Sequence, residues 1–408
     1  ATTVFRTALP QPLWTTIHLV TLGVLTNGIL QWSWYFGRAL LRLPPGDRHS
    51  GRDNTRRILA LNAALVVLIA SMWAEWAPGA VVGATGVGAV AAWHGLALVV
   101  AARTRLASRF AVVLRYYAAA AAFLVLAAVL AGLVATAAFA ASAPQWLLGA
   151  RSAITVAHAI AGVGGWVGLT MGGTIVTLGP TAVRTRMDPR AVDLASLALP
   201  VWAAGLLAAV AGALAGHMRA VAAGLAVVGL AAAAGIAYPL ARAAMRKGPS
   251  EYGSWSMCLG TAWILVGVAV VAQHAWTTGT GEQLRAANLP WLPIIGAGGL
   301  GQVFIGALTY LMPVVIGGGP RAVRVGVGAL EAAAPMREAS RNAALVLLAA
   351  ATASQAPAAA PLATACWAVV LATYLADIAL MARAGTAQAR ARTAPPSPSP
   401  SNTGGPRG

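Results

Sequence analysis

Charged residues are scarce in this chain of 408 residues, and their scarcity excludes an ordinary soluble domain. Only 9% of the residues are charged, against roughly 25% in soluble proteins, whereas 59% are hydrophobic. The mean hydropathy is +0.73, and long apolar runs fit membrane-spanning helices, which need about 20 apolar residues each. The alternating segments of about ten residues that mark a membrane β-barrel are absent. The sequence therefore predicts an all-α, polytopic transmembrane helical bundle.

Cysteine and lysine are nearly absent as well. The two cysteines, Cys258 and Cys366, give neither a disulfide framework nor a zinc-ligand spacing, and we expect both to be small core residues. Lys247 is the only lysine, so the net charge of +18 rests on arginine. These arginines fall mainly in short breaks between apolar runs, as the positive-inside rule expects, so the charge does not indicate nucleic-acid binding. Walker loops, dinucleotide fingerprints, nucleophile elbows and HExxH motifs are also missing.

The apolar runs predict about eleven spans, and the arginines predict their orientation. Arginine-rich loops alternate with loops that contain almost no basic residues. This pattern predicts a plasma-membrane protein with its N-terminus outside and its C-terminus in the cytoplasm. No cleavage pattern follows Arg6, so we expect the first helix to target the chain to the membrane. The run 340–356 is short and could be re-entrant. The predicted spans are 13–42, 57–77, 80–102, 110–142, 150–179, 191–215, 220–245, 252–277, 290–316, 340–356 and 360–384.

The C-terminal segment differs in composition from the rest of the chain. Residues 393–408 read TAPPSPSPSNTGGPRG and contain no core-forming residue beyond one alanine. We expect a disordered tail or a linker there, because such a segment cannot bury enough apolar surface to fold. Residues 1–392 then form the predicted transmembrane helical domain.

Histidine departs most from this apolar background. Five of the six histidines lie in or beside long apolar runs, and an ionisable side chain at membrane depth indicates a functional site. His18, His158 and His274 fall at similar depths, roughly 5–12 Å inside the outer ends of their helices, and His94 lies deeper. Three imidazoles in one layer could ligate haem iron axially or bind copper. The opposing interpretation is that each membrane histidine only bonds a carbonyl of a neighbouring helix.

Polar residues and glycines accompany these histidines. The first helix, HLVTLGVLTNGILQWSWYF from His18, carries Asn27 and Gln31 as an i, i+4 pair that should face the bundle interior. The fifth helix, HAIAGVGGWVGLTMGGTIVTLGP from His158, has a similar plan, which indicates a weak internal repeat. Its glycines could let a planar cofactor lie against the helix, or could serve ordinary close packing of helices.

The remaining polar candidates are weaker. His217 lies in a predicted outer loop beside a methionine, where it could be a copper-entry ligand, although an ordinary surface histidine fits better. His49 lies in the arginine-rich loop after the first span, and we expect it to be solvated. Glu75 and Asp377 are near predicted helix ends, and we expect them to snorkel or to pair rather than to relay protons.

Three segments resemble actinobacterial membrane proteins that are often labelled copper oxidase or multicopper-oxidase-associated. These proteins are similar in helix plan to the catalytic subunit of haem–copper oxidases and to the NnrS proteins of nitric-oxide tolerance. The segments are HLVTLGVLTNGILQWSWYF (18–36), HAIAGVGGWVGLTMGGTIVTLGPTAVRTRM (158–187) and GQVFIGALTYLMPVVIGGGP (301–320).

The resemblance implies a haem or copper role for His18 and His158. Tyr35 stands where relatives tend to have histidine, and the paired histidines of a haem–copper dinuclear centre are missing, so oxygen reduction is not expected. Some relatives continue into a periplasmic cupredoxin domain, and the Pro/Ser tail looks like the beginning of such a linker.

Three hypotheses follow. The first is a membrane protein of haem–copper-oxidase-like plan that binds haem or copper. It would take part in electron transfer or in the handling of nitrogen oxides or copper, and it could be a component of an oxidoreductase. It would act beside a cupredoxin, a multicopper oxidase or a nitrite reductase, with His18 and His158 as first ligands and His94 and His274 as next candidates. The second is a transporter of copper or a small solute, favoured by the internal repeat and by prolines that break helices. The third is a membrane anchor or assembly factor without a cofactor.

Overall fold

The computed structural model describes residues 10–43, 52–103, 110–354 and 360–393. All regular secondary structure within these ranges is helical. This confirms the predicted all-α fold. Ten helical stretches in the described ranges are long and apolar enough to cross a membrane, so the chain is a multi-pass helical membrane protein. These stretches are Pro12–Leu41, Arg52–Trp73, Ala77–Arg103, Ala111–Phe139, Gln145–Ala182, Ala191–Leu214, Met218–Arg246, Tyr252–Thr277, Leu292–Ile316 and Ala360–Thr393.

The chain forms two compact units, which are described separately. Unit 1 contains Ala1–Pro249 and Met257–Phe304, and unit 2 contains Ser250–Ser256 and Ile305–Gly408. The predicted domain 1–392 thus comprises parts of both units. His49 and the predicted tail beyond residue 393 lie outside the described residues.

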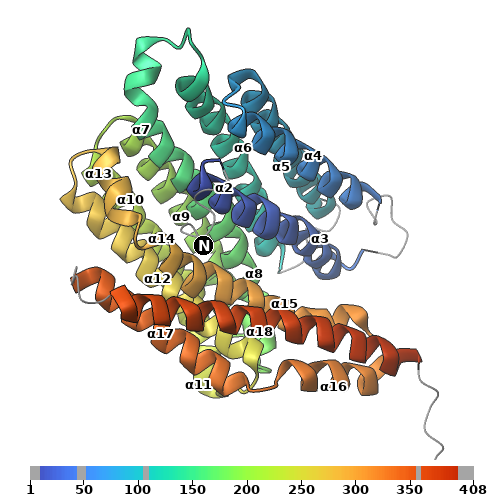
Figure 1. Ribbon diagram of the computed structural model, residues 1–408. Coiled ribbons are helices and arrows are strands. Elements are labelled where there is room, and N and C mark those ends of the chain that lie inside the picture. Colours follow the sequence, from blue (N-terminus) through green and yellow to red (C-terminus); the bar gives the residue numbers. More distant parts are fainter. Residues whose placement is uncertain (1–9, 44–51, 104–109, 355–359, 394–408) are drawn as a thin grey trace, which may run out of the picture. The chain divides into compact units, whose positions relative to one another are not determined.

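Unit 1 holds most of the helices, and Figure 1 shows their order along the chain. They are α2 (Pro12–His18), η1 (Leu19–Thr26), α3 (Asn27–Leu41), α4 (Arg52–Trp73), α5 (Ala77–Arg103), α6 (Ala111–Phe139), α7 (Gln145–Ala159), η2 (Ile160–Gly168), α8 (Leu169–Ala182), α9 (Ala191–Leu214), α10 (Met218–Ala232), η3 (Ala233–Ala237), α11 (Tyr238–Arg246), α13 (Gly281–Asn288), α14 (Leu292–Ile295) and η4 (Gly296–Gly301). Unit 2 holds α16 (Gly319–Leu330), α17 (Ala334–Ser354) and α18 (Ala360–Thr393), and both units share α12 (Tyr252–Thr277) and α15 (Gln302–Ile316).

Four of the candidate spans are interrupted by a π-helical segment, labelled η1 to η4. Such segments are rare and frequently accompany functional sites, because the wider turn redirects side chains and backbone groups. The segment η1 begins directly after His18, and η2 begins two residues after His158. The two helices that share the predicted repeat therefore both carry a histidine at the start of a π-helical segment.

Small residues let the helices of unit 1 approach one another closely. A Cβ atom on Gly83 of α5 would lie 2.7 Å from the backbone nitrogen of Leu68 in α4. A Cβ atom on Gly205 of α9 would lie 2.8 Å from the carbonyl oxygen of Gly224 in α10. Figure 1 shows α4, α5 and α6 lying side by side in this unit. Close approach of this kind supplies the packing that holds membrane helices together without a hydrophobic effect between them.

The predicted span 340–356 corresponds to α17, which begins at Ala334, and it is not among the ten candidate spans. Its first two turns contain Arg337, Glu338 and Arg341, which lower its hydropathy. The predicted spans 290–316 and 340–356 left Arg337 in the loop between them, and that prediction was wrong, because the residue lies within α17 and is 4% exposed.

Candidate functional site

His18 and His158 come together in unit 1 although 140 positions separate them in the sequence. His18 is the last residue of α2, and His158 lies in the last turn of α7. Their ring centroids are 6.2 Å apart, and the ring planes differ by only 17°. Both side chains are half-buried. The two imidazoles therefore form a pair between two different spans.

Backbone carbonyls fix which nitrogen of each ring carries the proton. Nδ1 of His18 lies 2.9 Å from the carbonyl oxygen of Trp14, and Nδ1 of His158 lies 2.8 Å from that of Ala127. Because a carbonyl oxygen can only accept, each neutral ring donates from Nδ1 and keeps its lone pair on Nε2. Within the described residues the structure shows no hydrogen bond to either Nε2. Metal-binding histidines have the same arrangement, in which the second ring nitrogen donates to a carbonyl or carboxylate.

The two imidazoles are close enough to share one small site, with ring centroids 6.2 Å apart and nearly parallel ring planes. No group of three or more His, Cys, Asp and Glu residues in the described ranges could hold a metal ion. The donors that the described residues offer here are therefore two imidazoles, which suit copper or haem iron.

Neighbouring contacts hold the pair in place. The indole of Trp14 stacks on His18 with 4.1 Å between ring centroids. Nε1 of Trp166, which is 2% exposed, donates to Oγ1 of Thr26 at 2.9 Å and joins η2 to η1. The hydroxyl of Thr26 in turn donates to the carbonyl oxygen of Thr21 at 2.7 Å. The π-helical segments that follow the two histidines are thus hydrogen-bonded to each other.

The other histidines named from the sequence lie elsewhere in unit 1. His94 is fully buried, and its Nε2 lies 2.8 Å from Oγ of Ser33. Ser33 is about 20 Å further along the first span than His18, at about 1.5 Å per residue. His274 donates from Nδ1 to Oδ1 of Asn288 at 2.9 Å and packs edge-on against Trp291. His217 is exposed and precedes α10 as its N-cap residue. The structure pairs only His18 and His158 among the histidines of its described residues.

The predicted polar pair of the first span finds partners in the second. Asn27 and Asn62 exchange hydrogen bonds between their side-chain amides, with distances of 2.8 and 3.2 Å. Gln31 accepts a hydrogen bond of 3.2 Å from the amide of Asn54. Both residues therefore bond the neighbouring helix α4. Asn27 is half-buried, but Gln31 is exposed, so the prediction that both face the bundle interior was wrong for Gln31.

The glycines after His158 serve mainly as contact points between helices. A Cβ atom on Gly165 would lie 2.4 Å from the Cβ atom of Phe123 in α6, and one on Gly173 would lie 2.6 Å from that of Tyr116. A Cβ atom on Gly164 would lie 2.8 Å from a methyl carbon of Leu206 in α9. Side chains from α6 and α9 cover this face, so the packing interpretation holds for these three glycines.

Replacing Gly165 by alanine is expected to destabilise the folded protein by about 1–3 kcal/mol, because the added methyl group overlaps Phe123. Gly162 offers the matched control, since a Cβ atom there would lie 3.9 Å from Ala127, an ordinary contact. Thermal unfolding of both variants in detergent measures the difference. Equal stability of Gly165→Ala and Gly162→Ala would show that α6 does not pack against the helix as described.

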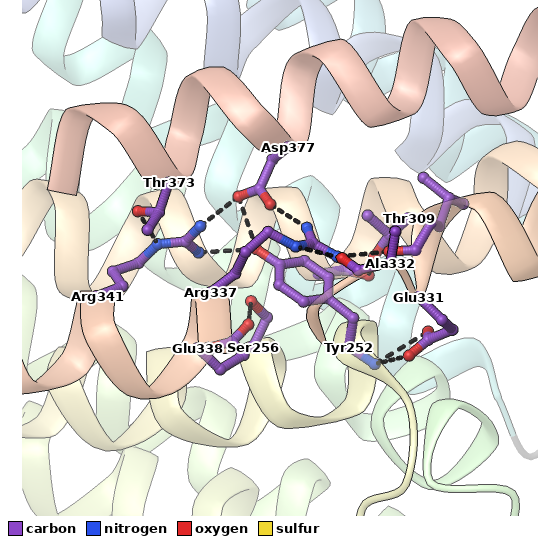
Figure 2. A network of polar contacts seen from close by, with 12 residues as sticks. Tyr252, Ser256, Thr309, Glu331, Ala332, Arg337, Glu338, Arg341, Thr373 and Asp377 are labelled. Atoms are coloured by element: carbon purple, nitrogen blue, oxygen red, sulfur yellow. Dashed lines mark hydrogen bonds and ion pairs between the residues drawn. The ribbon is translucent and has the colours of Figure 1, made fainter. Parts of the chain in front are cut away.

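A buried charge network in unit 2 was missed by the sequence reasoning, and Figure 2 shows it. Asp377 of α18 forms ion pairs with Arg337 and Arg341 of α17 and accepts a hydrogen bond of 2.6 Å from the hydroxyl of Tyr252. Nη1 of Arg341 donates to the same hydroxyl at 2.8 Å, and its Nε donates to Thr373 at 3.1 Å. The side chains of Arg341 and Asp377 are fully buried. The pairing expected for Asp377 is confirmed.

Glu338 and the ring of Tyr252 complete this network. The hydroxyl of Ser256 donates to the carboxylate of Glu338, and Tyr252 lies 4.0 Å from the guanidinium of Arg337. Burial raises the pKa of the Glu338 carboxyl, while the hydrogen bond from Ser256 opposes that shift. The i, i+4 spacing of Arg337 and Arg341, which puts both on one helix face, was the available signal. It was overlooked because arginines near span ends were assigned to loops.

Comparison of the chain with protein-family models, curated proteins and solved structures finds no significant match. The resemblance to copper-oxidase-associated membrane proteins, to haem–copper oxidases and to NnrS proteins therefore stays a prediction. The functional argument rests on the geometry of the histidine pair.

Proposed function

We propose that this multi-pass membrane protein binds haem or copper through His18 and His158. It acts in electron transfer, or in handling of nitrogen oxides or copper, beside a redox partner such as a cupredoxin or a multicopper oxidase. The single observation that carries the proposal is the imidazole pair itself. Two rings 6.2 Å apart present Nε2 lone pairs while both Nδ1 atoms donate to carbonyls.

The surrounding residues prepare the two rings for a metal. When bound, copper or haem iron supplies one-electron redox chemistry. The carbonyls of Trp14 and Ala127 set the tautomer and orientation of each ring, so little rearrangement is needed when the ligands bind. Both half-buried imidazoles lie on apolar spans, and surroundings of low polarity would strengthen the influence of each hydrogen bond on the metal.

Two imidazoles suit copper better than haem, because copper requires less additional space in the protein. A single copper ion needs only the two Nε2 atoms, whereas haem also needs a planar slot for the porphyrin. The glycine face of η2 and α8 was the sequence-based candidate for that slot. Side chains of Phe123, Tyr116 and Leu206 cover it at Gly165, Gly173 and Gly164, so a porphyrin would have to lie elsewhere around the pair.

The interrupted helices favour a second candidate, a transporter of copper or a small solute. Transporters often place their binding sites at breaks in membrane helices. Four candidate spans contain π-helical segments, and two of these adjoin the histidine pair. In this alternative, His18 and His158 bind the transported ion during its passage instead of retaining it.

The test is an optical spectrum of the purified protein, oxidised and then reduced by dithionite, with metal analysis of the same sample. The protein should be produced with copper and haem precursors supplied. A retained metal near one equivalent is the expected result, and a reduced α-band in the visible identifies haem. Colourless protein free of iron and copper contradicts the proposal, and metal uptake by vesicles that contain such protein would favour the transporter.

A further inference from the structure

Arg57 of α4 is a buried cation without an ion-pair partner within the described residues. Its side chain is 1% exposed, and Nη2 donates to Oδ1 of the neutral Asn54 at 3.1 Å. Its Nε has no hydrogen-bond partner. The adjacent carboxylate on the same helix, Asp53, pairs instead with Arg56 at 3.1 Å, and both of these side chains are more than a third exposed. Arg57 thus retains an unused donor.

Two tryptophans hold this guanidinium in place without neutralising it. Cζ of Arg57 lies 4.3 Å from the ring centroid of Trp34 and 5.8 Å from that of Trp93. Cation–π contacts offset part of the cost of burying a cation, but they leave its N–H edge unsatisfied. A buried charge is normally paired with an opposite charge and hydrogen-bonded. Asp53, one turn earlier on the same helix, interacts with Arg57 electrostatically but pairs with Arg56, so within the described residues no carboxylate bonds the buried guanidinium.

His94 lies beside the same tryptophan and offers an unused acceptor. Its ring centroid is 6.4 Å from that of Trp34. The hydroxyl of Ser33 donates to the carbonyl oxygen of Ile29 at 2.6 Å, so its oxygen accepts the proton of Nε2 of His94 at 2.8 Å. The lone pair of this imidazole is therefore on Nδ1. That atom is buried and has no hydrogen-bond partner.

Arg57 and His94 together define the chemistry of a missing ligand. The positive charge and free N–H of Arg57 require an anionic oxygen, and the Nδ1 lone pair of His94 requires a hydroxyl donor. Both residues come from neighbouring spans, α4 and α5, and contact the same ring of α3. Arg57 lies about 8 Å from the first residue of α4, at about 1.5 Å per residue, so the cluster is close to an end of that span.

We propose that Arg57 and His94 bind an oxyanion that retains one proton, of the hydrogen phosphate or hydrogen carbonate class. One anionic oxygen accepts from Nε of Arg57, and the hydroxyl of the same ligand donates to Nδ1 of His94. A phosphate monoester on a lipid headgroup has the same chemistry as free phosphate. This site involves neither His18 nor His158, and the proposal is independent of metal binding.

The experiment measures thermal unfolding of the full-length protein in detergent at constant ionic strength. Inorganic phosphate, bicarbonate and nitrate are titrated separately, and a ligand that binds the folded state raises the midpoint as its concentration increases. We expect stabilisation by phosphate or bicarbonate and much less by nitrate, which has no proton to donate. Phosphatidic acid in mixed micelles, compared with phosphatidylcholine, tests the lipid source. Stabilisation by either source supports the site and identifies which ligand reaches it.

Variants test the assignment to these residues. Arg57→Gln is expected to weaken phosphate binding at least tenfold, and Arg57→Lys, which keeps the charge, provides a second test where the glutamine variant fails to fold. His94→Phe is expected to remove the preference for phosphate over nitrate. Arg56→Gln is the matched control, because Arg56 is exposed and should leave binding unchanged. No stabilisation by any protic oxyanion, equal effects of nitrate and phosphate on the unaltered protein, or an equal loss in Arg56→Gln would overturn the proposal.

Discussion

Replacing His158 by alanine is expected to abolish the proposed retention of copper or haem by the purified protein, together with any visible absorption that depends on it. Only one imidazole then remains, and no other His, Cys, Asp or Glu cluster in the described ranges can replace it. Loss of a group that only hydrogen-bonds a metal ligand lowers metal affinity about 10–100-fold. Loss of the ligand itself should therefore lower metal affinity more than about 100-fold. His18→Ala should behave in the same way. Metal analysis and optical spectra of both variants provide the measurement.

His274→Ala is the matched control for these two variants. His274 is also a half-buried histidine of unit 1, but its Nδ1 bonds the side chain of Asn288 and its ring packs against Trp291. Metal content and spectrum should therefore remain unchanged in that variant. If His274→Ala loses as much metal as His158→Ala, the pair is not the metal site. If all three retain it, His18 and His158 serve only to bond the backbone carbonyls of Trp14 and Ala127.

Replacing Asp377 by asparagine is expected to destabilise unit 2 by about 3–5 kcal/mol. The change leaves the guanidinium groups of Arg337 and Arg341 buried with no carboxylate between them. It also weakens the hydrogen bond from Tyr252 to this side chain. A large decrease in the midpoint of thermal unfolding, and faster cleavage by protease within unit 2, are the expected measurements.

Asp193→Asn supplies the comparison, because Asp193 is exposed in the first turn of α9 and should cost less than about 1 kcal/mol. The double variant Asp377→Asn with Arg341→Gln should lose less stability than the sum of the two single changes, since it leaves only one arginine unpaired. Strictly additive effects, or a midpoint for Asp377→Asn close to that of Asp193→Asn, would mean that the ion pairs do not hold α17 to α18.

The fold followed from the sequence because one physical constraint dominates it. In a lipid environment every backbone polar group needs an internal partner, so long apolar runs can form little except helices. The location of His18 and His158 within candidate spans also followed from the apolar runs. Their pairing could not be derived, since it depends on which spans are neighbours. The carbonyl of Ala127 that orients His158 belongs to α6, and nothing in its residue type marks it.

Other residues were harder to interpret because the same sequence feature fits two structures. The glycines from Gly162 to Gly173 suit both a cofactor surface and a helix contact, and only the positions of Phe123 and Tyr116 distinguish them. Arg337 has the sequence context of a loop arginine, yet the carboxylate that allows its burial lies 40 residues later in the chain. The π-helical segments also have no clear signature, since η1 and η2 continue apolar helices without a proline.

The charge network of unit 2 also constrains how the chain is made. In α17 alone, Arg337 and Arg341 have only Glu338 as a carboxylate on the same helix. Asp377, which binds both arginines, is synthesised 36–40 residues later. The buried ion pairs that join α17 to α18 can therefore form only after Asp377 has been synthesised, so this part of the protein acquires its final packing as a pair of helices.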